Sequence, residues 1–159
     1  MPRIERTATV TWEGNVARGS GHISAGTGAF TELPYSLPVR IGSGKEGKTS
    51  PEELLAAAHA GCLAMGLASE LTKRGTPPEH LEVDCRVTMD EVEGKGHQIV
   101  HSTCAVTARV GGIDASAFEE AVRLADEECP FSALIRASAA VTVNASLELA
   151  SEIGEEPNG

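Results

Sequence analysis

The sequence predicts an α+β fold, and three observations lead to this prediction. Alternation of apolar and polar residues indicates strands near both ends of the chain and in its middle. A long segment rich in alanine and leucine, beginning at Ser50, indicates one buried helix, and an amphipathic stretch after Asp114 indicates a second. The predicted order of elements is β-β-β-α-β-β-α-β. Most connections are local hairpins, which argues against a doubly wound sheet.

The chain has 159 residues, the length of one domain with a sizeable core. We expect this single domain to occupy residues 1–150. The acidic segment 151–159 is expected to be a disordered tail.

The first three strands are expected before residue 42. Residues 3–12 alternate, and after a turn residues 19–24 are expected to return as a second strand. Alternation resumes at Leu33 and predicts a third strand that ends near Ile41. Arg40 has the opposite parity, so its side chain should point away from the apolar face of that strand.

The long helix is predicted to begin at Ser50 and to end near Leu71. Ser50 can cap the helix, the next residue is a proline suited to the first turn, and Glu53 completes a capping box. The segment is apolar around its whole circumference, so we expect it to be buried on all sides. It carries Cys62 near its middle.

The clearest hairpin is predicted between residues 81 and 110. If Gly94 and Lys95 form a two-residue turn, the residue numbers of each pair of opposite residues sum to 189. Cys85 then faces Cys104. A second helix, capped by Asp114, is predicted to end at about Cys129, with that residue in its last turn on the buried stripe. A final strand is expected over residues 141–149.

Charge and composition limit the possible partners. The net charge of −10 argues against nucleic acid and anionic membranes. No apolar run is expected to span a bilayer, and the first residues lack the apolar core of a signal peptide, so a cytoplasmic location is expected. Four cysteines in such a chain favour thiol chemistry over a disulfide scaffold.

Cys62 and Cys129 are the candidate reactive residues. A thiol acts as a nucleophile only as the thiolate, and apolar surroundings raise its pKa, so a mid-helix cysteine needs a nearby cation. A peroxide-reducing thiol also needs a second thiol to capture its sulfenic acid. Cys129, on a buried stripe, is placed for that role, although either cysteine could instead be an inert core residue.

Several segments resemble one family, the osmotically inducible protein C and organic hydroperoxide resistance proteins (OsmC/Ohr), and its OsmC branch in particular. These segments are Thr49–Leu54, Ala58–Cys62, Trp12–Asn15, Pro34–Arg40, Gly112–Ser116 and Cys129–Ser132. The resemblance covers roughly residues 8 to 149.

The resemblance implies a thiol-dependent peroxidase that reduces organic hydroperoxides and hydrogen peroxide. Cys62 would be the peroxidatic residue and Cys129 the resolving one. Arg40 would supply the cation, held by the carboxylate of Glu52. The family uses no metal and no bound cofactor, and a dithiol reduces the disulfide. Its fold is an intertwined homodimer with sheets wrapped around long central helices.

The same residues are compatible with two other functions. The protein could be a stress-related carrier of a small apolar ligand with little turnover, or a general thiol–disulfide exchanger, although the latter usually has a Cys-x-x-Cys motif. His59 could be a base paired with Cys62, but a buried, hydrogen-bonded histidine is favoured.

A zinc site is the remaining alternative for the hairpin. Cys85 and Cys104 could bind the metal with His97 and His101, but the histidines are predicted on the opposite face of their strand from Cys104. Two buried core thiols are favoured instead.

Helix geometry implies that the site is shared between two chains. Glu52 and Cys62 are ten positions apart, which separates their Cα atoms by about 15 Å along a continuous helix. Side chains cannot close this gap. If the arginine–glutamate pair serves Cys62, a two-fold partner is expected to supply it.

Overall fold

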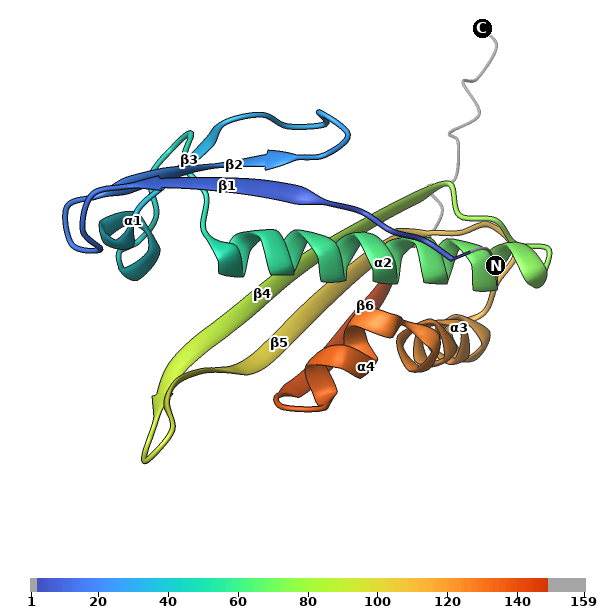
Figure 1. Cartoon of the computed structure of the whole chain (residues 1–159). Coiled ribbons are helices and arrows are strands. Elements are labelled where there is room, and N and C mark those ends of the chain that lie inside the picture. Colours follow the sequence, from blue (N-terminus) through green and yellow to red (C-terminus); the bar gives the residue numbers. More distant parts are fainter. Residues whose placement is uncertain (1–2, 149–159) are drawn as a thin grey trace, which may run out of the picture. The chain divides into compact units, whose positions relative to one another are not determined.

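The computed structural model of the chain describes residues 3–148 and contains six strands and four helices in those residues (Figure 1). The strands are β1 (Ala8–Glu13), β2 (Ser20–Ala25), β3 (Leu33–Tyr35), β4 (His80–Val92), β5 (Gly96–Arg109) and β6 (Ala140–Glu148). The helices are α1 (Leu37–Ile41), α2 (Pro51–Lys73), α3 (Ala115–Glu128) and α4 (Pro130–Arg136).

The chain divides into two compact units, with the division after Leu54, inside α2. Each unit is described by itself below. The single domain expected over residues 1–150 stays a prediction, and the segment 151–159 lies outside the described residues.

The N-terminal unit contains the antiparallel sheet β1-β2-β3. The predicted hairpin of the first two strands is confirmed, with Val10 opposite Ile23. Every residue of β1 is exposed in the single chain, including Trp12 at 37% and Val10 at 55%. The apolar side chains of β1 are therefore uncovered in the single chain.

The predicted third strand is longer than the observed one. β3 ends at Tyr35, and Leu37–Ile41 forms the short helix α1 instead of continuing the strand. Ser36 has the extended backbone of an N-cap residue, and Pro38 lies in the first turn, where its missing N–H breaks no helical hydrogen bond. Arg40 consequently lies in the last turn of a helix and not at the end of a strand.

α2 begins as the sequence predicts. The N–H of Glu53 donates to Ser50 Oγ over 3.1 Å, but the Glu53 carboxylate accepts from Thr49 Oγ1 at 2.8 Å, which differs from the expected reciprocal bond to Ser50. After the last helical residue, Lys73, the chain turns at Gly75, which has a left-handed backbone conformation. The N–H of Thr76 then donates to the carbonyl of Leu71.

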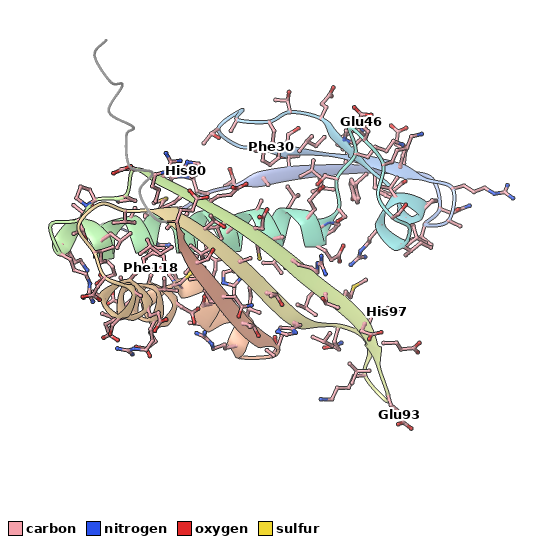
Figure 2. The ribbon with its side chains drawn as sticks, turned by 180° about the vertical axis from the view of Figure 1, so that it is seen from behind. Phe30, Glu46, His80, Glu93, His97 and Phe118 are labelled. Atoms are coloured by element: carbon pink, nitrogen blue, oxygen red, sulfur yellow. The ribbon has the colours of Figure 1, made fainter. Side chains whose placement is uncertain are left out.

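The C-terminal unit contains the sheet β4-β5-β6, with α2 and α3 packed against it (Figure 1). Its core combines leucines of α2, alternate residues of β5, and the buried stripe of α3 with Phe118 (Figure 2): Leu63, Leu67, Leu71, Cys104, Val106, Ala108, Phe118, Val122 and Ala125. β6 pairs in parallel with β5, because the intervening helices carry the chain back across the sheet.

The hairpin has the predicted register over most of its length, with Cys85 opposite Cys104. The register shifts by one residue between Thr88 and Met89, so that Val92 pairs with Gly96. The predicted two-residue turn is therefore wrong, because three residues lie between the paired ends. The tip at Glu93 lies beyond the part of β5 that β6 covers (Figure 2).

The second helix is confirmed from its Asp114 cap, whose side chain accepts from the N–H of Ala117 at 2.8 Å. Its end differs from the prediction. Cys129 lies just after α3 and forms the N-cap of α4, because Pro130 ends one helix and fits the first turn of the next.

The expectation that α2 is buried on all sides is wrong for the single chain. Its buried residues form a stripe of His59, Leu63, Leu67, Glu70 and Leu71, whereas Met65 is 76% exposed. The expectation that no apolar run could span a bilayer is also wrong by length and hydropathy, because α2 meets both criteria. The core helix of a globular protein meets the same criteria, and this stripe packs in such a core.

Candidate active site

The structure brings Cys62 and Cys129 together in the C-terminal unit. Cys62 projects from the middle of α2 and is half-buried, and Cys129 at the α3–α4 junction is 3% exposed. The two thiols are close enough that Cys129 raises the pKa of Cys62. They are 67 positions apart in the sequence, so the fold, and not local spacing, makes them a pair.

Backbone N–H groups at the start of α4 affect both thiols. The N–H of Ser132 donates to Cys129 Sγ over 3.5 Å, and the backbone N–H of Phe131 lowers the pKa of Cys62. These donors are fixed by the helix that Pro130 begins. The Phe131 N–H favours the thiolate of Cys62 over its thiol, because it is oriented before any charge develops.

The balance of effects in this unit nevertheless disfavours the Cys62 thiolate. Burial raises the pKa of Cys62, and the neighbouring Cys129 thiol raises it further, which the Phe131 N–H only partly offsets. A thiol with a raised pKa is largely protonated at neutral pH. Cys62 would therefore need a cation to become a good nucleophile.

Arg40 and Glu52 form the second pair of predicted site residues, within the N-terminal unit. The guanidinium group holds the carboxylate through Nε at 3.0 and 3.1 Å and through a terminal nitrogen at 2.6 Å. Burial, the largest single effect, raises the pKa of Glu52, but the hydrogen bonds from Arg40, from its own backbone N–H and from Ser50, together with the charge of Arg40, outweigh burial and lower the pKa. The pair is therefore ionised, and the arginine is held in one orientation.

His59 is a buried, hydrogen-bonded core residue, as the sequence favoured. It is 0% exposed; Nδ1 lies 2.8 Å from Ser102 Oγ and Nε2 lies 2.8 Å from Ser132 Oγ. Burial lowers the pKa of His59, so the imidazole is neutral. By holding Ser132, His59 fixes the first turn of α4 next to the two thiols. Sequence reasoning missed both serines, because they are 43 and 73 positions from the histidine.

His97 and His101, the histidines considered for a zinc site, lie apart from Cys85 and Cys104. His101 Nε2 contacts Thr142 Oγ1 at 2.8 Å on β6, and His97 is exposed near the hairpin tip (Figure 2). The absence of a zinc site formed by these four residues stays a prediction. Cys85 and Cys104 are free thiols, and Cys104 is fully buried.

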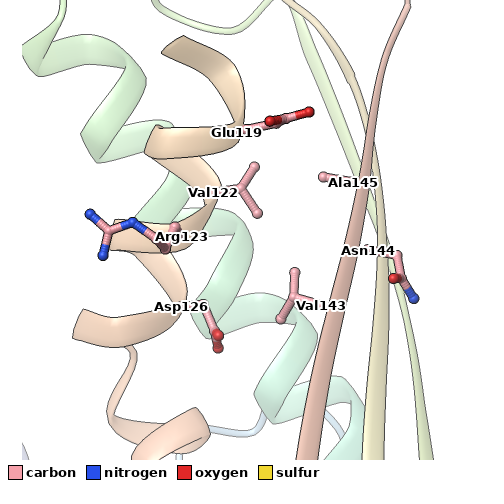
Figure 3. Close-up of a pocket in the computed structure, with 7 residues that line it drawn as sticks. All are labelled: Glu119, Val122, Arg123, Asp126, Val143, Asn144 and Ala145. Atoms are coloured by element: carbon pink, nitrogen blue, oxygen red, sulfur yellow. The ribbon is translucent and has the colours of Figure 1, made fainter. Parts of the chain in front are cut away.

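A separate hollow of about 420 Å³ lies between α3 and β6 in the same unit (Figure 3). Glu119, Arg123 and Asp126 line it from α3, and Val143 and Asn144 line it from β6. This lining includes no cysteine. The hollow is therefore distinct from the thiol pair and offers no nucleophile of that kind.

We expect Cys104→Ala to lower the free energy of unfolding by about 1–2 kcal/mol, since it removes a fully buried sulfur from the core. The matched control is Cys85→Ala on the opposite strand, where the half-buried side chain should cost less. Urea unfolding of both variants under reducing conditions measures the difference. Equal losses in the two variants would contradict the prediction.

The fold and the site together define a class of protein: an α+β protein in which a helical cysteine contacts a second cysteine at a helix junction. The sequence model of the family described as OsmC-like protein matches residues 42–144. The chain is also 34% identical to peroxiredoxin OsmC of Escherichia coli K12 over 134 residues, which cover 84% of this chain and 92% of that protein. The chain belongs to the OsmC family.

Solved structures support the fold assignment. An organic hydroperoxide resistance protein OsmC from Legionella pneumophila, 25% identical, has a TM-score of 0.68 and covers 91% of this chain and 99% of its own. An organic hydroperoxide resistance protein from Elizabethkingia anophelis has a TM-score of 0.71 at 20% identity and covers 93% of this chain and 100% of its own. The predicted α+β, OsmC-like fold is thus confirmed.

Proposed function

We propose that the protein is a thiol-dependent peroxidase that reduces organic hydroperoxides and hydrogen peroxide in stress defence. The observation that carries this proposal is the contact between Cys62 and Cys129, in a chain of the OsmC family. A relative named peroxiredoxin and structural neighbours named for hydroperoxide resistance support the same chemistry. No cofactor is needed, since the thiols carry all the electrons.

The reaction has two thiol steps. The Cys62 thiolate attacks one peroxide oxygen, an S–O bond forms and the O–O bond breaks, and the leaving alkoxide takes a proton to become the alcohol. Cys129 then attacks the sulfenic sulfur of Cys62. An S–S bond forms, the S–O bond breaks, and the hydroxyl leaves as water. An external dithiol reduces the disulfide and restores both thiols.

Arg40 and Glu52 would activate the peroxidatic thiol. The raised pKa of Cys62 calls for a cation, and the carboxylate of Glu52 fixes Arg40 as one. α2 is continuous from Pro51 to Lys73, so no break in the helix shortens the path between Glu52 and Cys62. We therefore place the arginine and glutamate of each site on the partner chain of a homodimer.

Exposed apolar side chains support this homodimer. Met65 on α2 is 76% exposed, Ile41 of α1 is 71% exposed, and the β1 strand has no buried residue in the single chain. Apolar surface of this kind is usually covered by a partner. An intertwined dimer would cover the free sides of α2 as well as the uncovered strand.

Peroxide consumption tests the proposed function directly. Purified protein with dithiothreitol should consume cumene hydroperoxide or tert-butyl hydroperoxide catalytically, and the rate should scale with enzyme concentration. The alternative is a carrier of a small apolar ligand, which would require neither the thiol pair nor the arginine–glutamate pair. Absence of turnover with every peroxide tested would favour that carrier.

Arg40→Ala is expected to slow peroxide reduction at neutral pH. Without the cation the pKa of Cys62 should rise by about one unit or more, each unit being worth about 1.4 kcal/mol. The check is the rate of Cys62 alkylation as a function of pH, which should shift to higher pH in the variant.

The matched control for that experiment is Arg123→Ala. Arg123 also forms ion pairs, with Glu120 and Glu127, but on the exposed face of α3. Its loss should leave the alkylation profile in place. Identical profiles for Arg40→Ala and the unmodified protein would show that Arg40 does not activate the thiol.

We also propose that the protein acts in the cytoplasm, without nucleic acid or membrane partners. The net charge of −10 opposes binding to polyanions and anionic lipids. The reduced thiols that the reaction requires are maintained in that compartment.

A further inference from the structure

We propose that His59, Cys85 and Cys104 form a binding site for a zinc-type divalent metal ion, separate from the peroxidatic thiols. The three residues come from α2, β4 and β5, and their ligand atoms all lie within 4.8 Å of one another. His59 and Cys104 are fully buried and Cys85 is half-buried. Among residues 3–148 this is the one group of three such ligands.

The spacing of the ligand atoms matches tetrahedral zinc. Bonds of about 2.3 Å to sulfur and about 2.0 Å to nitrogen place neighbouring N and S ligands about 3.6 Å apart. His59 Nδ1 lies 3.7 Å from Cys85 Sγ and 3.6 Å from Cys104 Sγ. With the two sulfurs within 4.8 Å of each other, this spacing suits three ligands around one ion.

The surrounding hydrogen bonds also suit a metal ligand. With Nε2–H donating to Ser132 Oγ, the Nδ1 lone pair of His59 faces the two sulfurs. A second hydrogen bond of this kind commonly orients a ligating histidine. Ser102 Oγ lies 2.8 Å from Nδ1 and 3.4 Å from Cys85 Sγ, so its hydroxyl can rotate away or occupy the fourth position.

The charges balance in a buried setting. Binding one divalent ion releases the two thiol protons of Cys85 and Cys104 to solvent, and two thiolates with a neutral imidazole leave no net charge. A buried cluster tolerates a neutral site far better than an isolated ion. Soft thiolates with an imidazole also favour zinc over magnesium or calcium. The family's metal-free chemistry uses Cys62 and Cys129, so it does not conflict with this second site.

The test uses a Cys62→Ser, Cys129→Ser background, in which Cys85 and Cys104 are the only thiols left. Reduced protein is titrated with Co²⁺, and Zn²⁺ is then added in competition. We expect one equivalent per chain, a tetrahedral d–d spectrum and a thiolate-to-cobalt charge-transfer band, all displaced by Zn²⁺. Adding Cys85→Ser should remove the charge-transfer contribution of one thiolate and weaken binding at least tenfold.

A second measurement does not depend on how Cys85→Ser folds. In the background protein, Zn²⁺ should protect both remaining thiols from alkylation, counted by intact mass. Failure to bind Co²⁺ or Zn²⁺, cobalt bound without thiolate charge transfer, or alkylation unaffected by Zn²⁺ would each overturn the proposal. The Co²⁺ spectrum and the alkylation count do not use peroxidase activity, so they are independent of the proposed function.

Discussion

Cys62→Ser is expected to abolish peroxide reduction, whereas Cys129→Ser should still reduce one equivalent of hydroperoxide per chain. Cys62 supplies the attacking sulfur, so its replacement leaves no nucleophile for the peroxide. Cys129 acts only after the sulfenic acid has formed, and its nearby thiol is the group that captures it. Without that capture Cys62 should remain a sulfenic acid and then over-oxidise under excess peroxide.

Intact-mass analysis after one equivalent of hydroperoxide distinguishes these outcomes. The unmodified protein should lose two hydrogens as one disulfide forms, and Cys129→Ser should gain one oxygen. Peptide mapping should find the disulfide between Cys62 and Cys129. A wild-type disulfide that joins any other pair of cysteines would refute the assignment.

Patterns that repeat along the chain gave the fold reliably. The alternation on β4 and β5 predicted the pairing of Cys85 with Cys104, because a slip of one residue would turn every apolar side chain outward. The caps at Ser50 and Asp114 likewise located two helix starts, since each satisfies backbone groups of its own first turn.

The short helices α1 and α4 were not predicted, because their sequences are also compatible with other structures. Leu37, Val39 and Ile41 share a strand parity, yet five residues that contain a proline also make one turn of helix. Pro130 was read as a stop signal, although it both ends α3 and begins α4. The hairpin bulge left no trace in the apolar pattern.

The candidate site was predictable only in part. Cys62, Cys129, Arg40 and Glu52 came from motifs, and the structure brings them together as two pairs. The contacts of His59 could not be foreseen, because its partners lie on β5 and α4. The proximity of His59 to Cys85 and Cys104 was equally unpredictable, because His59 is far from both cysteines in the sequence. His97 and His101 were considered instead because they lie close to Cys104 in the sequence.

A mixed dimer should recover activity that both parent dimers have largely lost. One chain carries Cys62→Ser, and the other carries Arg40→Ala with Glu52→Ala. If each site takes its thiols from one chain and its arginine–glutamate pair from the other, the heterodimer contains one site with every residue intact and one that lacks Cys62, Arg40 and Glu52. Its activity should approach roughly half that of the unmodified dimer, as expected for one of two equivalent sites.

This expectation depends on the unbroken α2 helix. Glu52 and Cys62 are ten residues apart along it, so their Cα atoms are separated by about 15 Å. The two chains carry different affinity tags, are mixed under exchange conditions, and are purified through both tags before assay. Each parent homodimer, treated identically, is the control. If the site were complete within one chain, each chain of the heterodimer would keep its own defect. A verified heterodimer without recovered turnover would therefore exclude the shared site.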